Sequence, residues 1–544
     1  MKNILKHSAL YLLLFMTLIV VGSTCLFFIH VGISKYHLIS FLIINTVIYY
    51  FLTKKKISIK EFKKLVLLSI GIILISTLIG TFTFDRSSDG NTYHKDATGV
   101  LKEGFNPVYE ESYDFIKERD NSSTLTDYSI WTDHYAKANW IIGSNFYALT
   151  DNIESGKAMN FITLYIVFSL IFSYLLDKLS LKQSLIISLV TVINPITAAQ
   201  FFTYYNDQLV CLYLFLSIFY LIKLENNLKS KELWFGYILT FILLANMKFN
   251  GLGYLLVFSF LFVCKYLYNA YKKKEFLKLF KKLCLIFIPL FIVSLVIVGY
   301  PTYVKNTIDH SNPFFPLYDD NGEDIITAQE PKSFVHMNNI KKLYYGTFSK
   351  ANNLRENDKT TIKVPFMVYK DEIKPATSND LRISGWGVLF SGLLIVSIVI
   401  LITKYKDHKK ENYLLYALGI TVLLLIVMSE SWWARYTPHF YLFIIFSLYI
   451  LCKYGKNKYS RYIYLALIVI NTSIPLLGNT YYTFTNSIKI RKDFKSLSNK
   501  SIVLKEDNYH GILYNLKDFD IDYKINNKIK GKELYYHYLE YKEK

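Results

Sequence analysis

The sequence predicts an all-α polytopic membrane protein, and three observations lead to that prediction. The chain of 544 residues is 52% hydrophobic and 17% aromatic, which is too apolar for a set of ordinary soluble domains. It contains about thirteen apolar windows close to the ~20 residues that cross a bilayer. Its Lys and Arg residues are divided unevenly among the connections between these windows. We therefore expect about thirteen transmembrane helices.

The apolar windows differ in length. Those at 38–52, 208–222 and 438–452 are short, so re-entrant or interfacial segments are alternatives there. The first window is over ~20 residues long and has no small-residue cleavage site after it, so we expect a retained helix rather than a signal peptide. In chain order the windows are 8–29, 38–52, 65–84, 157–176, 183–199, 208–222, 233–248, 252–268, 283–300, 385–403, 413–429, 438–452 and 462–478.

The positive charge indicates an orientation. If the amino terminus is cytoplasmic, the inner connections hold about 28 Lys and Arg, whereas the short outer turns hold three, namely Lys35, Lys248 and Arg435. This asymmetry follows the positive-inside rule, so the net charge of +20 does not require nucleic acid as a partner. The abundance of Lys, Ile, Asn and Tyr is typical of AT-rich bacterial genomes. We expect a multi-pass protein of a bacterial plasma membrane.

With this orientation the non-membrane surface is concentrated outside the cell. The predicted transmembrane domain covers 1–478 and carries two long outer loops, 85–156 and 301–384. The extracytoplasmic tail 479–544 alternates apolar and polar residues in places, which permits a small α/β cap. All five cysteines lie in apolar windows, so neither a disulfide framework nor a zinc site is expected.

The first outer loop is acidic. From Asp85 to Gly156 it holds 13 acidic and 6 basic residues, whereas 301–384 holds 11 of each. An acidic patch beside the membrane favours a metal ion, an amine or proton transfer, although any single acid can simply be solvated. In the same loop, 128–150 has aromatic residues at three- and four-residue spacing, which predicts an amphipathic helix on the membrane plane. Asp151, with Glu154 three residues later, is the expected N-cap of the next span.

Several outer turns carry charged residues that are unusual in plain connectors. Asp207 stands where a helix begins, so it is either a cap or a functional acid. Lys248 is a cation against the positive-inside bias, so it either snorkels or meets an anionic phosphate. His310 opens a loop fixed by Pro313 and Pro316, which suits either a sugar-binding wall or a plain rigid loop.

The segment "SESWWARYTPHF" follows the eleventh window. We expect its adjacent Trp432 and Trp433 to belong to the aromatic belt at the headgroup level. Arg435 is harder to explain as a connector, because guanidinium binds phosphate bidentately and is rare on this face. Carboxylates from the first outer loop and cations from other outer loops would then lie at the same level relative to the membrane. Such an arrangement suits a substrate with a lipid tail, a phosphate and a reactive group beyond the phosphate.

These segments resemble the GT-C superfamily of multipass glycosyltransferases, which use polyprenyl-phosphate-linked sugars. The resemblance covers most of residues 60–450. It is carried by "DRSSDGNTYHKDATGVLKEGFNP", "HYAKANWIIGSNFYALTDNIESGKAMN", "NPITAAQFFTYYNDQ", "ANMKFNG", "HSNPFFPLY", "RISGWGVLF" and "SWWARYTP".

The resemblance implies a function and a set of site residues. A carboxylate of the first outer loop would act as general base on the acceptor hydroxyl, with Asp89 as the first choice and Asp85 as the second. Arg435 and Lys248, with His94 and His310 nearby, would bind the substrate and its lipid phosphate. Some members hold a divalent metal such as Mg²⁺ or Mn²⁺, for which Asp89, His94 and Asp207 are the candidates. The partners would be a polyprenyl-phosphate-sugar donor, a glycan or lipid-linked acceptor of the cell envelope, and membrane lipid.

Three other functions fit the same composition. A polymerase or ligase of polyprenyl-linked glycans also works on the outer face. A lipid or glycan transporter of the flippase type would place ionisable or helix-breaking residues near mid-membrane, and few charges lie deep in the windows. A scaffold of a cell-envelope complex would need no catalytic residue.

Overall fold

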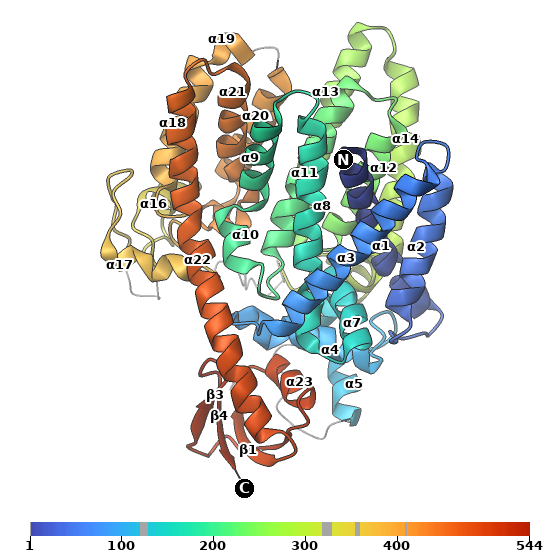
Figure 1. Ribbon diagram of the computed structural model, residues 1–544, viewed down its shortest axis with the longest axis vertical. Helices are drawn as coiled ribbons and strands as arrows, with labels where there is room; N and C mark the ends of the chain where they lie inside the picture. Colours follow the sequence, from blue (N-terminus) through green and yellow to red (C-terminus); the bar gives the residue numbers. More distant parts are fainter. Residues whose placement is uncertain are drawn as a thin grey trace.

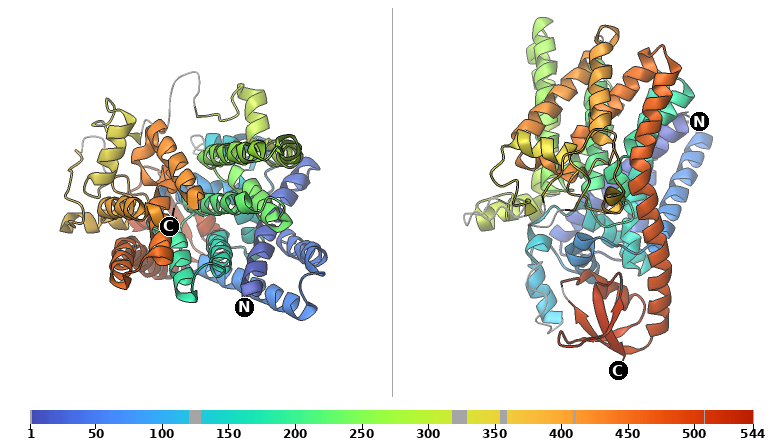
Figure 2. Two further views of the ribbon diagram at one scale, coloured as in Figure 1. Left: turned by 90° about the horizontal axis from the view of Figure 1, so that it is seen from above. Right: turned by 90° about the vertical axis from the view of Figure 1, so that its left-hand side faces the viewer.

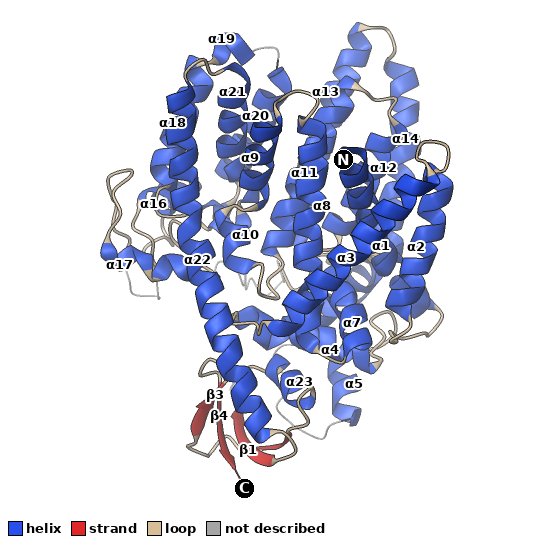
Figure 3. Cartoon of the chain, viewed as in Figure 1, coloured by secondary structure: helices blue, strands red, loops and turns tan. Residues whose placement is uncertain are grey.

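Helices form most of this computed structural model, which describes residues 2–119, 129–317, 329–353, 359–408, 411–506 and 508–543 (Figures 1 and 3). Each of the thirteen apolar windows overlaps a helix, and the window 183–199 is divided between α9 and α10 (Pro195–Gln200). These helices are α1 (Lys2–Phe28), α2 (His37–Thr53), α3 (Ile59–Phe82), α8 (Ala158–Leu175), α9 (Leu181–Val192), α11 (Asp207–Asn226), α12 (Lys231–Ala245), α13 (Phe249–Lys272), α14 (Phe276–Phe291), α18 (Phe390–Thr403), α20 (Asn412–Val427), α21 (Leu442–Tyr454) and α22 (Lys458–Leu497).

Within the described residues, seven helices are long and apolar enough to cross a membrane. They correspond to α1, α3, α8, α11, α13, α14 and α22. The apolar stretch 208–222 is short, which makes a re-entrant or interfacial segment an alternative. In the structure it belongs to a helix of 20 residues, α11, which is long enough to cross a membrane. The apolar helices α2, α9, α18, α20 and α21 are shorter. The described chain is thus largely helical, with seven helices long and apolar enough to cross a membrane, and thirteen crossings remain a prediction.

The two ends of the bundle differ in the way that the charge pattern predicts. The lysine-rich turn between α13 and α14 and the short helix α19 (Tyr405–His408) lie at the upper end in Figure 1. The opposite end carries α4 (Lys95–Glu103), α5 (Ser112–Arg119) and a β-sheet. Between these levels, α16 (Asn339–Phe348) and α17 (Lys370–Ile373) lie at one side of the bundle. The lysine-rich connections therefore lie at one end and 95–119 with the β-sheet at the other, whereas α16 and α17 lie between them.

The described part of 128–150 is not a surface helix, so that prediction is wrong. The segment forms α6 (Ser129–His134) and α7 (Ala138–Thr150), and residues 138–148 are all buried. Helix α7 packs against α4, and a Cβ at Gly143 would lie 3.2 Å from the Thr98 side chain, so small residues permit the close approach. Asp151 ends α7 in the left-handed region, with φ of 49°. Asn152 caps the next turn instead, since its side chain accepts from the Glu154 N–H.

The carboxyl-terminal end is not helical throughout. Helix α22 has 40 residues and passes through the expected domain boundary at 478 (Figure 2). Beyond it, β1 (Ser501–Glu506) is parallel to β2 (Asp522–Ile525) and antiparallel to β4 (Leu539–Glu543), which pairs with β3 (Lys532–Leu534). Helix α23 (Gly511–Lys517) connects β1 to β2, so 501–543 is a small α/β unit with a sheet of order β2-β1-β4-β3.

One buried lysine joins this terminal unit to the first outer loop. Lys95 of α4 has no exposed side-chain surface and donates to Glu154 (2.5 Å) and Asn91 (2.8 Å). It also donates to Asn515 (2.8 Å) and Tyr535 (2.7 Å) of the terminal unit. A buried ammonium is costly unless such partners surround it, so the network fixes the α/β unit against the membrane domain.

We therefore predict that Lys95→Met loosens the terminal unit. Glu154 and the polar groups of Asn515 and Tyr535 would lose a buried partner, and this should cost about 3–5 kcal/mol. Faster amide hydrogen exchange across 501–543, with α1 and α8 unaffected, is the expected result. Lys517→Gln is the matched control, because Lys517 pairs with Glu103 at 3.1 Å on the surface and should contribute under about 1 kcal/mol. Equal exchange in both variants would contradict this role of Lys95.

Candidate functional site

The turn that carries Asp89 is held by Asp85. Asp85 is fully buried, and its carboxylate accepts from the backbone N–H groups of Ser87 (2.7 Å) and Tyr204 (2.9 Å). Burial raises the pKa of this carboxyl. A Cβ at Gly90 would lie 2.0 Å from the Asp85 carboxylate, so the tight turn requires glycine there. Asp85 thus shapes the loop from inside, whereas the Asp89 side chain is 29% exposed.

Arg435 lies among three carboxylates from distant segments. Its Nη2 is 3.3 Å from Asp89, its Nη1 is 3.3 Å from Asp380, and its Nε is 3.6 Å from Asp207. Within the described residues neither Nε nor Nη1 makes a hydrogen bond of normal geometry, although both are buried. Buried guanidinium N–H groups are rarely left in that state. Arg435 therefore retains donor capacity that a further acceptor could use.

Lys248 extends this group of charges, which we call the Arg435 cluster (Asp89, Asp207, Lys248, Asp380 and Arg435). Its Nζ lies 2.5 Å from Asp207, which opens α11. Lys248 directly precedes α13. Three carboxylates and two cations thus meet near the end of the bundle that bears the long polar segments. The cluster carries a net negative charge when all five groups are ionised.

Aromatic side chains surround the guanidinium. The Arg435 guanidinium lies 4.7 Å from the ring centre of Trp433 and 5.2 Å from that of Tyr205. Trp433 Nε1 donates to Asp380 at 3.0 Å, and Trp432 stacks on Trp433. Both tryptophans are buried within the protein, so the prediction of an aromatic belt is wrong for this pair. They hold the cluster in place because they pack against its charges and supply an N–H donor.

A polar cavity of about 780 Å³ adjoins the cluster. Asp380 and Tyr205 line it, and so does Ser88, which directly precedes Asp89. The far wall includes Tyr536 and Tyr538 of the terminal α/β unit. The cavity therefore lies between the membrane domain, the loop segment 329–331 and the α/β unit.

The two histidine candidates occupy different places. His94 is buried, and its Nδ1 accepts from the Trp140 indole at 2.8 Å. Burial and the nearby Lys248 lower its pKa to about 3, so the ring is neutral. His310 ends α15 (Lys305–His310), is exposed and stacks on Phe315 at 3.6 Å between ring centres. Within the described chain no contact joins His310 to the Arg435 cluster.

The metal candidates do not form a metal site as arranged. Among the described residues no group of three or more His, Cys, Asp or Glu side chains is placed to hold a metal ion. Trp140 occupies Nδ1 of His94, and Asp207 is paired with Lys248 and Arg435. A divalent metal at Asp89, His94 and Asp207 therefore stays a prediction, and the proposal below is written in terms of protein side chains.

Sequence reasoning brought out four of the five cluster members and missed Asp380. Asp380 is one of 11 acids between 301 and 384, and its local sequence "SNDLR" has no distinctive spacing. Its partner Arg435 lies more than 50 positions later. Asp380 can therefore be recognised only from the three-dimensional structure, which brings it next to Arg435.

Comparison with known proteins gives no assignment: no protein-family model matches the chain, and no curated protein matches it. The likeness to the GT-C superfamily therefore depends on the sequence segments that carry it.

The cluster predicts a strong effect of Arg435→Gln on stability. This change leaves three crowded carboxylates with one cation, so the free energy of unfolding should fall by about 3–5 kcal/mol. The fall should appear as a lower thermal midpoint of the protein in detergent. Adding Asp380→Asn removes one of the repelling charges and should restore part of the loss. A double-mutant cycle measures this coupling, and strictly additive effects of the two changes would refute it.

Proposed function

We propose that this protein is a membrane glycosyltransferase of the GT-C type. It would move a sugar from a polyprenyl-phosphate donor to a glycan or lipid-linked acceptor of a bacterial cell envelope. The supporting observation is the convergence of Asp89, Arg435 and Lys248 from three distant segments beside a large polar cavity. The positive-inside asymmetry favours the outer face of the plasma membrane for this reaction.

Asp89 is the general base in this proposal. Its carboxylate is partly exposed beside the polar cavity, whereas the Asp85 carboxylate is buried and occupied by two backbone N–H groups. Asp89 would take the proton of the acceptor hydroxyl as that oxygen attacks the anomeric carbon of the donor sugar. The lipid phosphate leaves with the electron pair of the broken C–O bond. Arg435, with its unused donors, and Lys248 would stabilise the charge on that phosphate.

The donor and the acceptor need separate approaches to this centre. A small cavity lies between Arg435, Pro195 of α10 (Pro195–Gln200) and Pro475 of α22, on the side of the helical bundle. Its volume of about 10 Å³ holds about one water, so the phosphate end of the donor would reach Arg435 from this side only after the surrounding side chains move apart. The polar cavity lined by Tyr536 and Tyr538 would receive the acceptor, since aromatic rings and polar groups suit sugar faces and hydroxyls.

Asp89→Asn should lower transfer by at least about 100-fold and leave the thermal midpoint unchanged, because a general base contributes roughly 10²–10⁴-fold to rate. The assay uses purified protein in vesicles with polyprenyl-phosphate donors that carry radiolabelled hexoses. Asp85→Asn is the contrasting variant, which should lower the thermal midpoint because Asp85 holds the turn.

Two results would count against the proposal. A fully active Asp89→Asn protein would remove Asp89 from the mechanism. Movement of the labelled lipid across the vesicle membrane without a new glycosidic bond would favour a transporter instead.

Donor binding should depend on pH through Asp380. Burial raises the pKa of this carboxyl above its ordinary value, so Asp380 takes up a proton earlier than a solvated aspartate as the pH falls. The cluster then loses a negative charge, so an anionic phosphodiester should bind more tightly as the pH falls and Asp380 takes up its proton. Asp380→Asn should bind tightly at every pH. A pH-independent affinity in the unmodified protein would contradict this prediction, which equilibrium binding of a non-hydrolysable donor analogue tests.

A further inference from the structure

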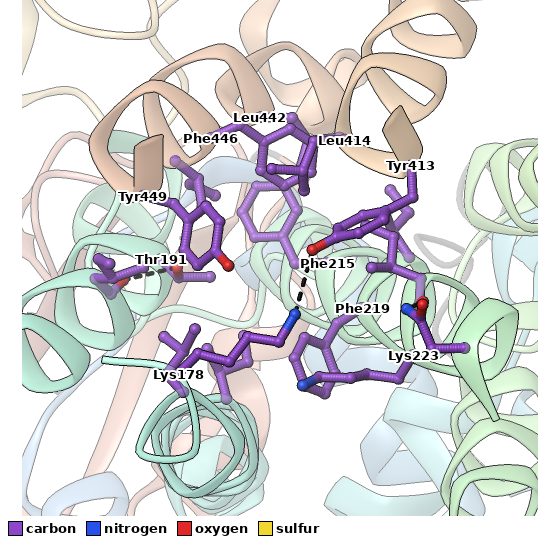
Figure 4. A pocket seen from close by; sticks show the side chains of 17 residues that line it. Lys178, Thr191, Phe215, Phe219, Lys223, Tyr413, Leu414, Leu442, Phe446 and Tyr449 are labelled. Carbon is purple, nitrogen blue, oxygen red and sulfur yellow. Dashed lines mark hydrogen bonds between the residues drawn. The ribbon is translucent and has the colours of Figure 1, made fainter. Parts of the chain in front are cut away.

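A second pocket lies toward the lysine-rich end of the bundle, away from the Arg435 cluster. It has a volume of about 100 Å³ and lies among α8, α9, α11, α20 and α21 (Figure 4). Phe215, Leu442 and Phe446 contribute to its apolar wall. Lys178, Lys223 and Tyr413, which line the pocket, lie near helix ends that the basic connections join. The pocket is therefore largely apolar inside and lies toward the helix ends that the basic connections join.

Two lysines line this pocket without a carboxylate partner. The Lys178 amine lies 3.3 Å from the Tyr413 hydroxyl (Figure 4). The Lys223 amine lies over the rings of Tyr174 (5.4 Å) and Phe219 (5.5 Å). Within the described residues neither lysine forms an ion pair. Other lysines at this end do, and their pairs are Lys2–Asp177, Lys6–Glu232, Lys265–Glu225 and Lys453–Glu411.

This contrast argues against simple snorkelling. A lysine that only seeks water extends away from apolar surface, whereas Lys223 is half-buried against two aromatic rings. Two neighbouring ammonium groups also repel each other unless an anion lies between them. The pocket thus combines an apolar interior with two lysines at its edge. Asp177 and Glu411 interact with Lys223 at longer range, and each is paired with another lysine.

We propose that this pocket binds an anionic glycerophospholipid of the adjacent leaflet. The phosphate would lie between the Lys178 and Lys223 amines, with the Tyr413 hydroxyl as a further donor, and a segment of one acyl chain would fill the apolar interior. Basic pockets between transmembrane helices on the cytoplasmic side suit such headgroups. The inference is independent of the glycosyltransferase proposal, since it uses none of the Arg435 cluster.

The test offers purified full-length protein an equimolar mixture of phosphatidylglycerol and phosphatidylcholine with identical chains, and native mass spectrometry counts the retained lipids. Each lysine near a membrane surface contributes about 1 kcal/mol to anionic binding, so two lysines predict a preference of about 30-fold for phosphatidylglycerol. The K178Q/K223Q variant should lose it. The K178R/K223R variant, which keeps both charges, should retain it and also shows whether a change at these positions is tolerated.

Lys182→Gln is the matched control. Lys182 is exposed at the same end, does not line the pocket, and lies over the ring of Tyr462 at 5.2 Å. Its loss removes one positive charge from the same surface and should leave the preference intact. Equal retention of the two lipids by the unmodified protein, or an unchanged preference in K178Q/K223Q, would overturn the proposal. If K182Q lost the preference for phosphatidylglycerol as fully as K178Q/K223Q does, the proposal would also be overturned. The preference would then come from the total positive charge of this surface and not from the pocket.

Discussion

The electrostatic balance around Arg435 is the constraint that holds together the distant segments at this end of the protein. Three carboxylates lie within 3.6 Å of its guanidinium, and each comes from a different part of the chain. Such a group depends on its cations, because crowded carboxylates that lose a buried cationic partner cost several kcal/mol. The first outer loop, α11, the segment before α18 and the turn before α21 are therefore held in one arrangement. The same arrangement creates a partly exposed acid beside a cation with spare donors.

The buried Lys95 network has a complementary role. It joins α4 to the terminal α/β unit, and Asp85, whose carbonyl accepts from Tyr535 at 3.0 Å, connects that network to the turn bearing Asp89. Tyr536 and Tyr538, which follow Tyr535, line the polar cavity. The terminal unit thus contributes a wall of the polar cavity, and it also supports the turn that bears Asp89. We infer that its docking and the geometry of the site depend on each other.

The sequence predicts the helical segments well because hydrophobic length and periodicity are local properties. It also indicates Asp89, Lys248 and Arg435, since charges at the outer ends of apolar windows are rare. The surface placement of 128–150 fails because burial of α7 depends on Gly143 meeting α4, which is a tertiary contact. Asp380 escapes notice for the same reason: its importance comes from Arg435, and no local pattern links them. The β-sheet is visible only as weak alternation, since its strands have three to six residues.

We infer that the Arg435 cluster receives a lipid-linked phosphate with the sugar facing Asp89. An experimental structure of the protein with a non-hydrolysable polyprenyl-phosphate-sugar analogue would show where the phosphate binds. We expect the phosphate to lie within hydrogen-bonding distance of Arg435 and Lys248, with the anomeric carbon on the side of Asp89. A phosphate bound elsewhere, with all three Arg435 ion pairs unchanged, would contradict it.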